Sequence, residues 1–212
     1  MTARGLSILA AALALLGSIA PLRAGNPPGR EGSVRVLYSI EWGYDATLMD
    51  AYHYNRLDSE DGFRIDEKKV KPMLYSNAHA SVAVSLEFAR RFALGLHAGY
   101  AGVLQDTRFF PLSLRSTFFF NAYDRDSRFV FAEGGAGLHE TRSAVSPFAR
   151  LGYGYRFRLT RRASIELSAS LRCTYDHPPI YDASIPGYVP EEFILRSDAL
   201  YGSMLFSVAL NF

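Results

Sequence analysis

Three side chains of the kinds that carry out hydrolysis lie close together in the sequence, at His139, Glu140 and Ser143. Covalent hydrolysis needs a nucleophile, a base within about 3 Å of it and an acid that orients the base. Two further histidines, His53 and His177, lie in long polar segments. A Ser, a His and a Glu within a few residues are common by chance, and sequence spacing does not establish distances. The elements that carry these residues must therefore be identified first.

The segment Phe148–Tyr175 has the clearest periodicity in the chain. From Leu151 onward, apolar residues alternate with Arg, Gly, Ser and Glu, with one interruption at Thr160–Arg162. Such alternation places every apolar side chain on one face of a sheet and every polar side chain on the other. The segment is therefore predicted to form a hairpin with a polar face rich in Arg and Ser, and an opposite face that is large, aromatic and continuous.

Five further segments show similar alternation: Val34–Tyr44, Leu74–Phe88, Phe92–Ala101, Phe110–Phe120 and Ala199–Phe212. A sixth strand is predicted at Arg128–His139, where the alternation is least regular. Short turns are predicted at Ala89–Arg91, Asn121–Ser127 and Thr160–Arg162, and loops at Ala46–Pro72, Gln105–Thr107, Glu140–Ser146 and Asp176–Ser197. A barrel strand crosses a bilayer in about 9–11 residues, and turns alternate with longer loops in such barrels. The sequence therefore predicts an all-β fold, an eight-stranded antiparallel up-and-down transmembrane β-barrel.

The N-terminal segment has the composition of an export signal. Arg4 precedes an apolar run, and Leu22-Arg23-Ala24 is a suitable cleavage site, so residues 1–24 are predicted to be a signal peptide. Residues 25–32 would form a short leader and residues 33–212 the outer-membrane β-barrel. Because the chain ends on a strand, we expect no periplasmic peptidoglycan-binding domain.

Charge and cysteine content narrow the possible functions. Cleavage of the signal would lower the Lys and Arg count from 23 to 21, against 21 Asp and Glu, so the mature chain would be neutral. No basic stretch indicates nucleic acid. Cys173 is the only cysteine, which excludes an internal disulfide and a thiolate metal site. We predict no cofactor and no metal.

The polar parity of the strands places charged side chains inside the barrel. The predicted network consists of Arg35, Glu41, Glu87, Arg115, Glu133, Arg150, Arg156, Arg158, Glu166 and Arg172, with His79 and His97 beside it. Counting back from the short turns pairs Glu166 with Arg156 and Glu133 with Arg115. Because an unpaired buried charge is costly, these groups should pair and fill the lumen. The alternative is a narrow gated pore, or a proton-linked site at the two histidines.

Aromatic residues near the strand ends suggest two interfacial belts. One belt would contain Trp42, Tyr44, Tyr100, Phe110 and Tyr175, and the other Phe88, Phe92, Phe118, Phe120, Phe157 and Phe212. If these rings instead packed inside, the chain would be a soluble sandwich. A soluble lipocalin-like barrel would likewise have an apolar interior and a polar exterior.

The segments FFPLSLRSTFFFNAYDRDSRFVFAEGGAGL and SPFARLGYGYRF resemble the outer membrane beta-barrel domain common in Bacteroidetes-type proteins, and the whole pattern resembles the small OmpA/OmpX-like barrels of Gram-negative bacteria. The resemblance implies an outer-membrane location, contact with membrane lipid and lipopolysaccharide, and a monomer. It also implies that the barrel-assembly machinery reads a C-terminal signal, here Phe206, Val208, Leu210 and Phe212. The glycine usual in that signal would fall at Ser203.

The resemblance leaves three functions open. A structural or surface-interaction protein would bind a host or surface ligand through its long loops, which contain Tyr52, Tyr54, Tyr181 and Tyr188. A lipid A deacylase or acyltransferase would use His139, Glu140 and Ser143. A narrow gated pore would conduct through the lumen. We expect the first of these, a protein that is not an enzyme.

Overall fold

The computed structural model describes residues 34–58, 62–88, 90–104, 108–139, 144–160, 163–181 and 187–212. The predicted signal peptide and leader lie outside the described residues, as do Glu140 and Ser143 of the possible hydrolytic triplet. Within the described ranges, no helix has the length and hydropathy needed to span a bilayer.

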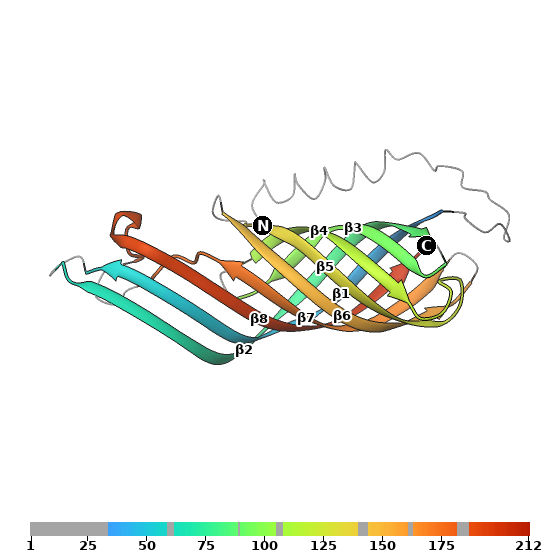
Figure 1. Ribbon diagram of the computed structural model, residues 1–212, viewed down its shortest axis with the longest axis horizontal. Coiled ribbons are helices and arrows are strands. Elements are labelled where there is room, and N and C mark those ends of the chain that lie inside the picture. The colour runs from blue at the N-terminus through green and yellow to red at the C-terminus, as the bar shows by residue number, and fades with distance from the viewer. Residues whose placement is uncertain are drawn as a thin grey trace.

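The described chain is a closed ring of eight antiparallel strands, in which each strand pairs with its sequence neighbours and β8 pairs with β1 (Figure 1). The strands are β1 (Arg35–Leu57), β2 (Arg64–Phe88), β3 (Phe92–Gly102), β4 (Arg108–Phe119), β5 (Ser127–His139), β6 (Val145–Arg158), β7 (Ser164–Asp176) and β8 (Ile194–Asn211). A short 3-10 helix, η1 (Glu191–Phe193), precedes β8. The prediction of an eight-stranded up-and-down barrel is confirmed.

The two faces of the wall differ as the alternation predicts. Leu167 and Phe206 are about half exposed on the outside, at 46% and 52%, whereas Arg156 on the inside is only 5% exposed. Large apolar side chains from all eight strands are exposed on the outside in this way. Because lipid contains no water to satisfy backbone groups, a closed ring with an apolar exterior suits a membrane-spanning chain.

The two ends of the barrel differ in how far the strands continue. The turns β2–β3, β4–β5 and β6–β7 lie at one end with Val34 and Phe212, and we call this the turn end. At the other end β1, β2 and β8 continue beyond the remaining strands (Figure 1), and we call these continuing segments the extension. Strands β3 to β7 have 11 to 14 residues, which is enough for one bilayer crossing.

The predicted loop over Ala46–Pro72 is wrong, because most of it continues β1 and β2. The pairing of β1 with β2 shifts between Thr47 and Met49, where Leu48 of β1 lies opposite two residues of β2. This β-bulge changes the inward parity of β1 from odd to even, so that Thr47 and Tyr52 are both buried. Because the alternation of apolar and polar residues is interrupted at this shift, the sequence pattern of β1 stops there, and the rest of the strand resembles a loop.

The predicted loop over Asp176–Ser197 is also too long. Strand β8 begins at Ile194 and pairs with β1 as far as Arg56. The extension is therefore a three-stranded sheet in which β1 lies between β2 and β8.

Glycines allow close approach of neighbouring strands at defined points, and this leads to a first prediction. A Cβ at Gly99 would lie 2.2 Å from the Ala80 carbonyl oxygen, whereas a Cβ at Gly134 would meet nothing within 4 Å. Gly99→Ala should therefore destabilise the barrel by about 1–3 kcal/mol, while Gly134→Ala should stay within about 0.5 kcal/mol of the parent. Urea unfolding of vesicle-folded protein, followed through Trp42 fluorescence, measures both. Equal midpoints for the two variants would contradict this packing.

Candidate functional site

A central ionic layer crosses the lumen at mid-height. Both Glu41 of β1 and Glu133 of β5 lie 2.8 Å from an Arg115 Nη atom. Arg150 of β6 donates from Nη2 to Glu41 at 2.9 Å, and its Nη1 lies 3.5 Å from Glu133. All four side chains are buried. Two guanidinium groups thus neutralise two carboxylates, and they join β1 to strands β4, β5 and β6 on the far side of the barrel.

Hydroxyl groups add further hydrogen bonds to this layer. Ser113 donates to Glu133 at 2.6 Å, and Arg150 donates from Nε to Ser170 at 2.7 Å and from Nη2 to Ser207 at 3.2 Å. Small inward Ser residues therefore leave room for the long arginine side chains, and Ser170 and Ser207 also accept hydrogen bonds from Arg150. Buried charge is tolerated where such secondary partners satisfy its remaining polar atoms.

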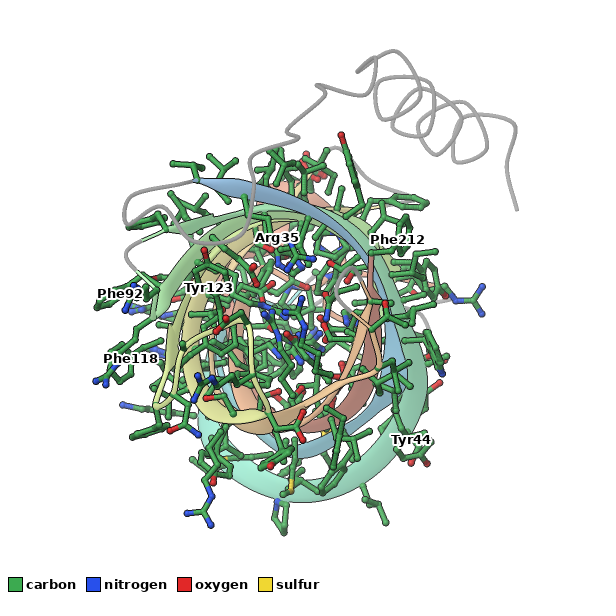
Figure 2. The ribbon with its side chains drawn as sticks, turned by 90° about the vertical axis from the view of Figure 1, so that its right-hand side faces the viewer. Arg35, Tyr44, Phe92, Phe118, Tyr123 and Phe212 are labelled. Atoms are coloured by element: carbon green, nitrogen blue, oxygen red, sulfur yellow. The ribbon has the colours of Figure 1, made fainter. Side chains whose placement is uncertain are left out.

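A second ionic layer lies nearer the turn end. Arg156 donates from Nε to Glu166 at 2.7 Å and from Nη1 to Glu87. Arg35 lies 4.0 Å from Glu87 and is partly exposed at the mouth of the barrel, where Figure 2 shows it inside the ring. Arg158 is half-buried at the same mouth, and its backbone N–H donates to Asp126 at 2.7 Å.

Both cross-strand ion pairs that the sequence predicts are present. Glu133 lies opposite Arg115 and Glu166 lies opposite Arg156 in the strand register, with ion-pair contacts in both cases. Arg172 forms an ion pair with Asp45, a partner that the sequence analysis did not include. Asp45 escapes notice in the sequence because it directly follows the aromatic Tyr44 at the start of the polar segment.

Aromatic rings inside the barrel are the main feature that sequence reasoning missed. Phe119, Phe129 and Phe131 pack together near the turn end, and Phe109, Phe148 and Tyr201 pack together near the extension. For Phe109 and Phe119 the signal is present in runs of adjacent phenylalanines, because neighbours in a strand face opposite sides. One member of each adjacent pair must therefore point inward.

The inward rings contact the buried arginines. The guanidinium carbons of Arg115 and Arg150 lie 4.4 and 5.1 Å from the centroid of Phe131, and that of Arg156 lies 4.2 Å from the centroid of Phe119. Cation–π attraction of this kind strengthens when the pair is desolvated. The lumen is therefore filled by alternating ionic and aromatic layers rather than by charges alone.

The two predicted lumen histidines border a small cavity. His79 and His97 line it with Glu133, Arg150 and Arg172, and its volume is about 10 Å³. His79 Nε2 lies 3.4 Å from Glu41. A volume of about 10–15 Å³ accommodates roughly one water molecule. The cavity can therefore hold an ordered water, but it is too small for a hydrated ion.

His139 contacts two residues that the sequence analysis did not include. Its Nε2 atom lies 2.6 Å from Ser146 Oγ and 3.2 Å from Asp176 Oδ1, and Ser146 Oγ donates to Asp176 at 2.7 Å. Ser146 and Asp176 are both buried. In a hydrolytic triad the acid contacts Nδ1 while the nucleophile contacts Nε2. Here the serine and the acid contact the same nitrogen, so the arrangement ties the ends of β5, β6 and β7 together.

The predicted loop tyrosines fall into two groups. Tyr52 is buried, stacks on Tyr54 at 4.4 Å between centroids, and donates its hydroxyl to Glu67 at 2.9 Å. Tyr181 and Tyr188, by contrast, are 67% and 59% exposed and meet edge to face at 6.3 Å.

The electrostatics of the extension follow from local contacts. Hydrogen bonds from Lys69 and Tyr52 hold the pKa of Glu67 below its usual value. Burial, together with the charge of Asp50, raises the pKa of Tyr54 to about 12. Of the other histidines, His53 pairs with Asp66 at 2.8 Å and His177 lies 3.1 Å from Asp198. These exposed pairs order the surface of the extension.

The residues of the predicted assembly signal all lie on the outer side of β8. Phe206 and Phe212 are exposed there, and Val208 and Leu210 are half-buried between β1 and β7. Their use as a signal stays a prediction. Within the described residues, no group of three or more His, Cys, Asp or Glu side chains could hold a metal ion.

The closed ring, the apolar exterior and the filled polar interior together define a transmembrane β-barrel of the outer-membrane type. No protein-family model matches the chain. No curated protein matches it either.

Solved structures similar to this chain include an outer membrane protein and a bacterial surface protein. The outer membrane protein OprG from Pseudomonas aeruginosa is 10% identical, with a TM-score of 0.50 over 85% of this chain and 98% of that chain. Neisserial surface protein A is 7% identical, with a TM-score of 0.44 over 84% of this chain and 97% of that one. The match to OprG shows a shared fold and no more. The finer resemblance, to OmpA/OmpX-like and Bacteroidetes-type barrels, stays a prediction.

The central ionic layer leads to a second prediction. Arg150→Met leaves the carboxylates of Glu41 and Glu133 with Arg115 as their shared arginine partner. Because part of the buried negative charge is then unpaired, the substitution should destabilise the folded barrel by about 3–5 kcal/mol. Arg108→Met removes an exposed arginine from the opposite, outer side of the wall and should change stability by less than about 0.5 kcal/mol. Urea unfolding of both variants measures the difference. A small effect of Arg150→Met would mean that the layer contributes little to stability.

Proposed function

We propose that this protein is an integral outer-membrane β-barrel with a plugged lumen, which serves as a structural or surface-interaction protein. The observation that carries the proposal is the central ionic layer, which joins β1 to the far wall through Arg115 and Arg150. Aromatic clusters above and below this layer fill the remaining width. A lumen filled in this way supports a role performed at the ends of the barrel rather than through it.

The proposed location is the outer membrane of a Gram-negative bacterium. Residues 1–24 would be the cleaved signal peptide, and Phe206 to Phe212 would be read by the barrel-assembly machinery. The turn end would then face the periplasm and the extension the outside, as in barrels with short periplasmic turns. The apolar exterior would contact lipid all round, which favours a monomer.

The extension is the proposed surface for interaction. It presents an ordered three-stranded sheet beyond the membrane, and Tyr181 and Tyr188 are exposed on the β7–β8 connection beside it. Exposed tyrosines supply large contact areas at low entropic cost, so they are enriched where proteins bind partners. The proposed partners are lipopolysaccharide around the barrel and a host or surface ligand at the exposed tyrosines.

We favour a non-catalytic role over lipid A modification. His139 contacts both Ser146 and Asp176 through one nitrogen, and the hydroxyl of Ser146 is hydrogen-bonded to the acid. An activated serine would instead donate its proton to a histidine whose other ring nitrogen is oriented by the acid.

The plugged lumen predicts low conductance. Purified protein in planar bilayers should conduct little, because ionic and aromatic layers fill the described lumen and the cavity beside His79 and His97 holds only about 10 Å³. Arg115→Ser combined with Arg150→Ser removes both central guanidinium groups and should raise conductance above that of the parent. Large, stable and reproducible channels in the parent protein would contradict the proposal.

The exposed tyrosines predict a loss of binding without a loss of folding. Tyr181→Ala with Tyr188→Ala should weaken attachment of intact cells at least about fivefold, since a truncated interface anchor costs about 1 kcal/mol or more. Tyr44→Ala with Tyr153→Ala removes two exposed rings from the membrane face and is the matched control. Unchanged attachment, serum survival and envelope integrity in the first variant would count against a binding surface at this site.

A further inference from the structure

Arginines gather on two neighbouring turns at the turn end. Arg90 and Arg91 lie in the β2–β3 turn, Arg125 lies in the β4–β5 turn, and Arg128 is the second residue of β5; all four are exposed. Backbone bonds hold the turns side by side, since the Phe119 N–H donates to the Arg91 carbonyl at 2.7 Å. The Tyr123 N–H likewise donates to the Arg90 carbonyl at 2.8 Å. The four arginines therefore belong to one continuous surface.

The two acidic residues of this surface, Asp124 and Asp126, interact with Arg158. Asp126 accepts the backbone N–H of Arg158, and Asp124 interacts electrostatically with the Arg158 guanidinium at the mouth of the barrel. For the side chains of Arg91, Arg125 and Arg128, the described part of the chain contains no ion pair or hydrogen bond. Even with both acids counted, four arginines against two aspartates leave a net positive patch.

A row of aromatic rings borders the arginines on the outer side of the wall. Phe88, Phe92, Phe118 and Phe120 follow one another with centroid separations of 6.3, 5.1 and 5.6 Å. Figure 2 shows Phe92 and Phe118 side by side on the outside of the barrel. The row is joined to the arginines by the backbone, because the Phe120 N–H donates to the Arg128 carbonyl at 3.0 Å. Apolar rings and cationic groups thus lie at adjacent levels.

We propose that this turn-end patch, formed by Arg91, Arg125, Arg128 and the four-ring row, binds the headgroup of an anionic phospholipid. Guanidinium groups donate in pairs to phosphodiester oxygens, so arginine suits this ligand better than lysine would. Aromatic rings prefer the boundary between headgroup and acyl chain, which is the level that the row would occupy. The inference rests on the proposed function, because a membrane-embedded barrel brings the patch to this boundary.

The chemistry selects a lipid over a free anion. A free phosphate would need only the arginines, whereas a phospholipid also places apolar chains where the rings are exposed. Both features lie on the same sector of the wall, over the ends of β2, β3, β4 and β5. The bound lipid is therefore expected to carry a net negative charge and two acyl chains.

The test measures lipid retention by detergent-solubilised full-length protein with native mass spectrometry. The probes are phosphatidylglycerol, zwitterionic phosphatidylcholine and soluble glycerol phosphate. The parent should retain phosphatidylglycerol in preference to both others. Arg91→Gln with Arg128→Gln should weaken that retention about 10- to 30-fold, since each cation near an anionic lipid contributes about 1 kcal/mol. Salt should weaken the parent's binding more than the variant's, because the variant has two fewer cations in the patch.

The matched control is Arg108→Gln with Lys68→Gln, which removes two exposed cations at the extension end and should change retention less than about twofold. A heat-modifiable gel shift in each variant shows that it is folded. Equal losses in the two variants, or equal retention of phosphatidylcholine, would overturn the lipid assignment. Glycerol phosphate binding as tightly as the lipid would indicate a simple anion site and overturn it as well. Failure of the proposed function shows separately, as large channels in the parent protein.

Discussion

The interior of this barrel depends on the pairing of buried guanidinium groups. The closed wall turns one parity of every strand into a narrow lumen, so Arg115, Arg150 and Arg156 cannot reach bulk water. Each must therefore meet a carboxylate, and each also lies against an aromatic ring. Some of these carboxylates lie on the neighbouring strand, whereas Glu41 and Glu87 reach Arg150 and Arg156 from across the lumen, so the same contacts that satisfy the charges also fill the space.

Most of the wall could be predicted from the sequence, because a period of two is visible wherever one face meets lipid. The pairs of Glu133 with Arg115 and of Glu166 with Arg156 follow from counting along hairpins with short turns. Contacts across the lumen, such as that of Arg150 with Glu41, depend on the closure and size of the ring. No local pattern contains that information.

The remaining errors have physical causes in particular residues. Leu48 interrupts the alternation of β1 at a bulge, and the strand beyond it was therefore assigned to a loop. Phe119 and Phe129 were missed because an apolar side chain was expected to face lipid. Ser146 and Asp176 were missed because they lie on different strands from His139, and only the folded register brings these three residues together.

The extension leaves one side of β2 without a strand. The pairing of β2 with β3 begins at His79, so among the described strands residues 64–78 of β2 pair only with β1. Such an open edge is a template for association of one sheet with another. Lysines at 68, 69 and 71, Pro72 and the adjacent bulge all oppose that association. Positive charges and a missing N–H donor along this border thus disfavour the pairing of two copies through β2.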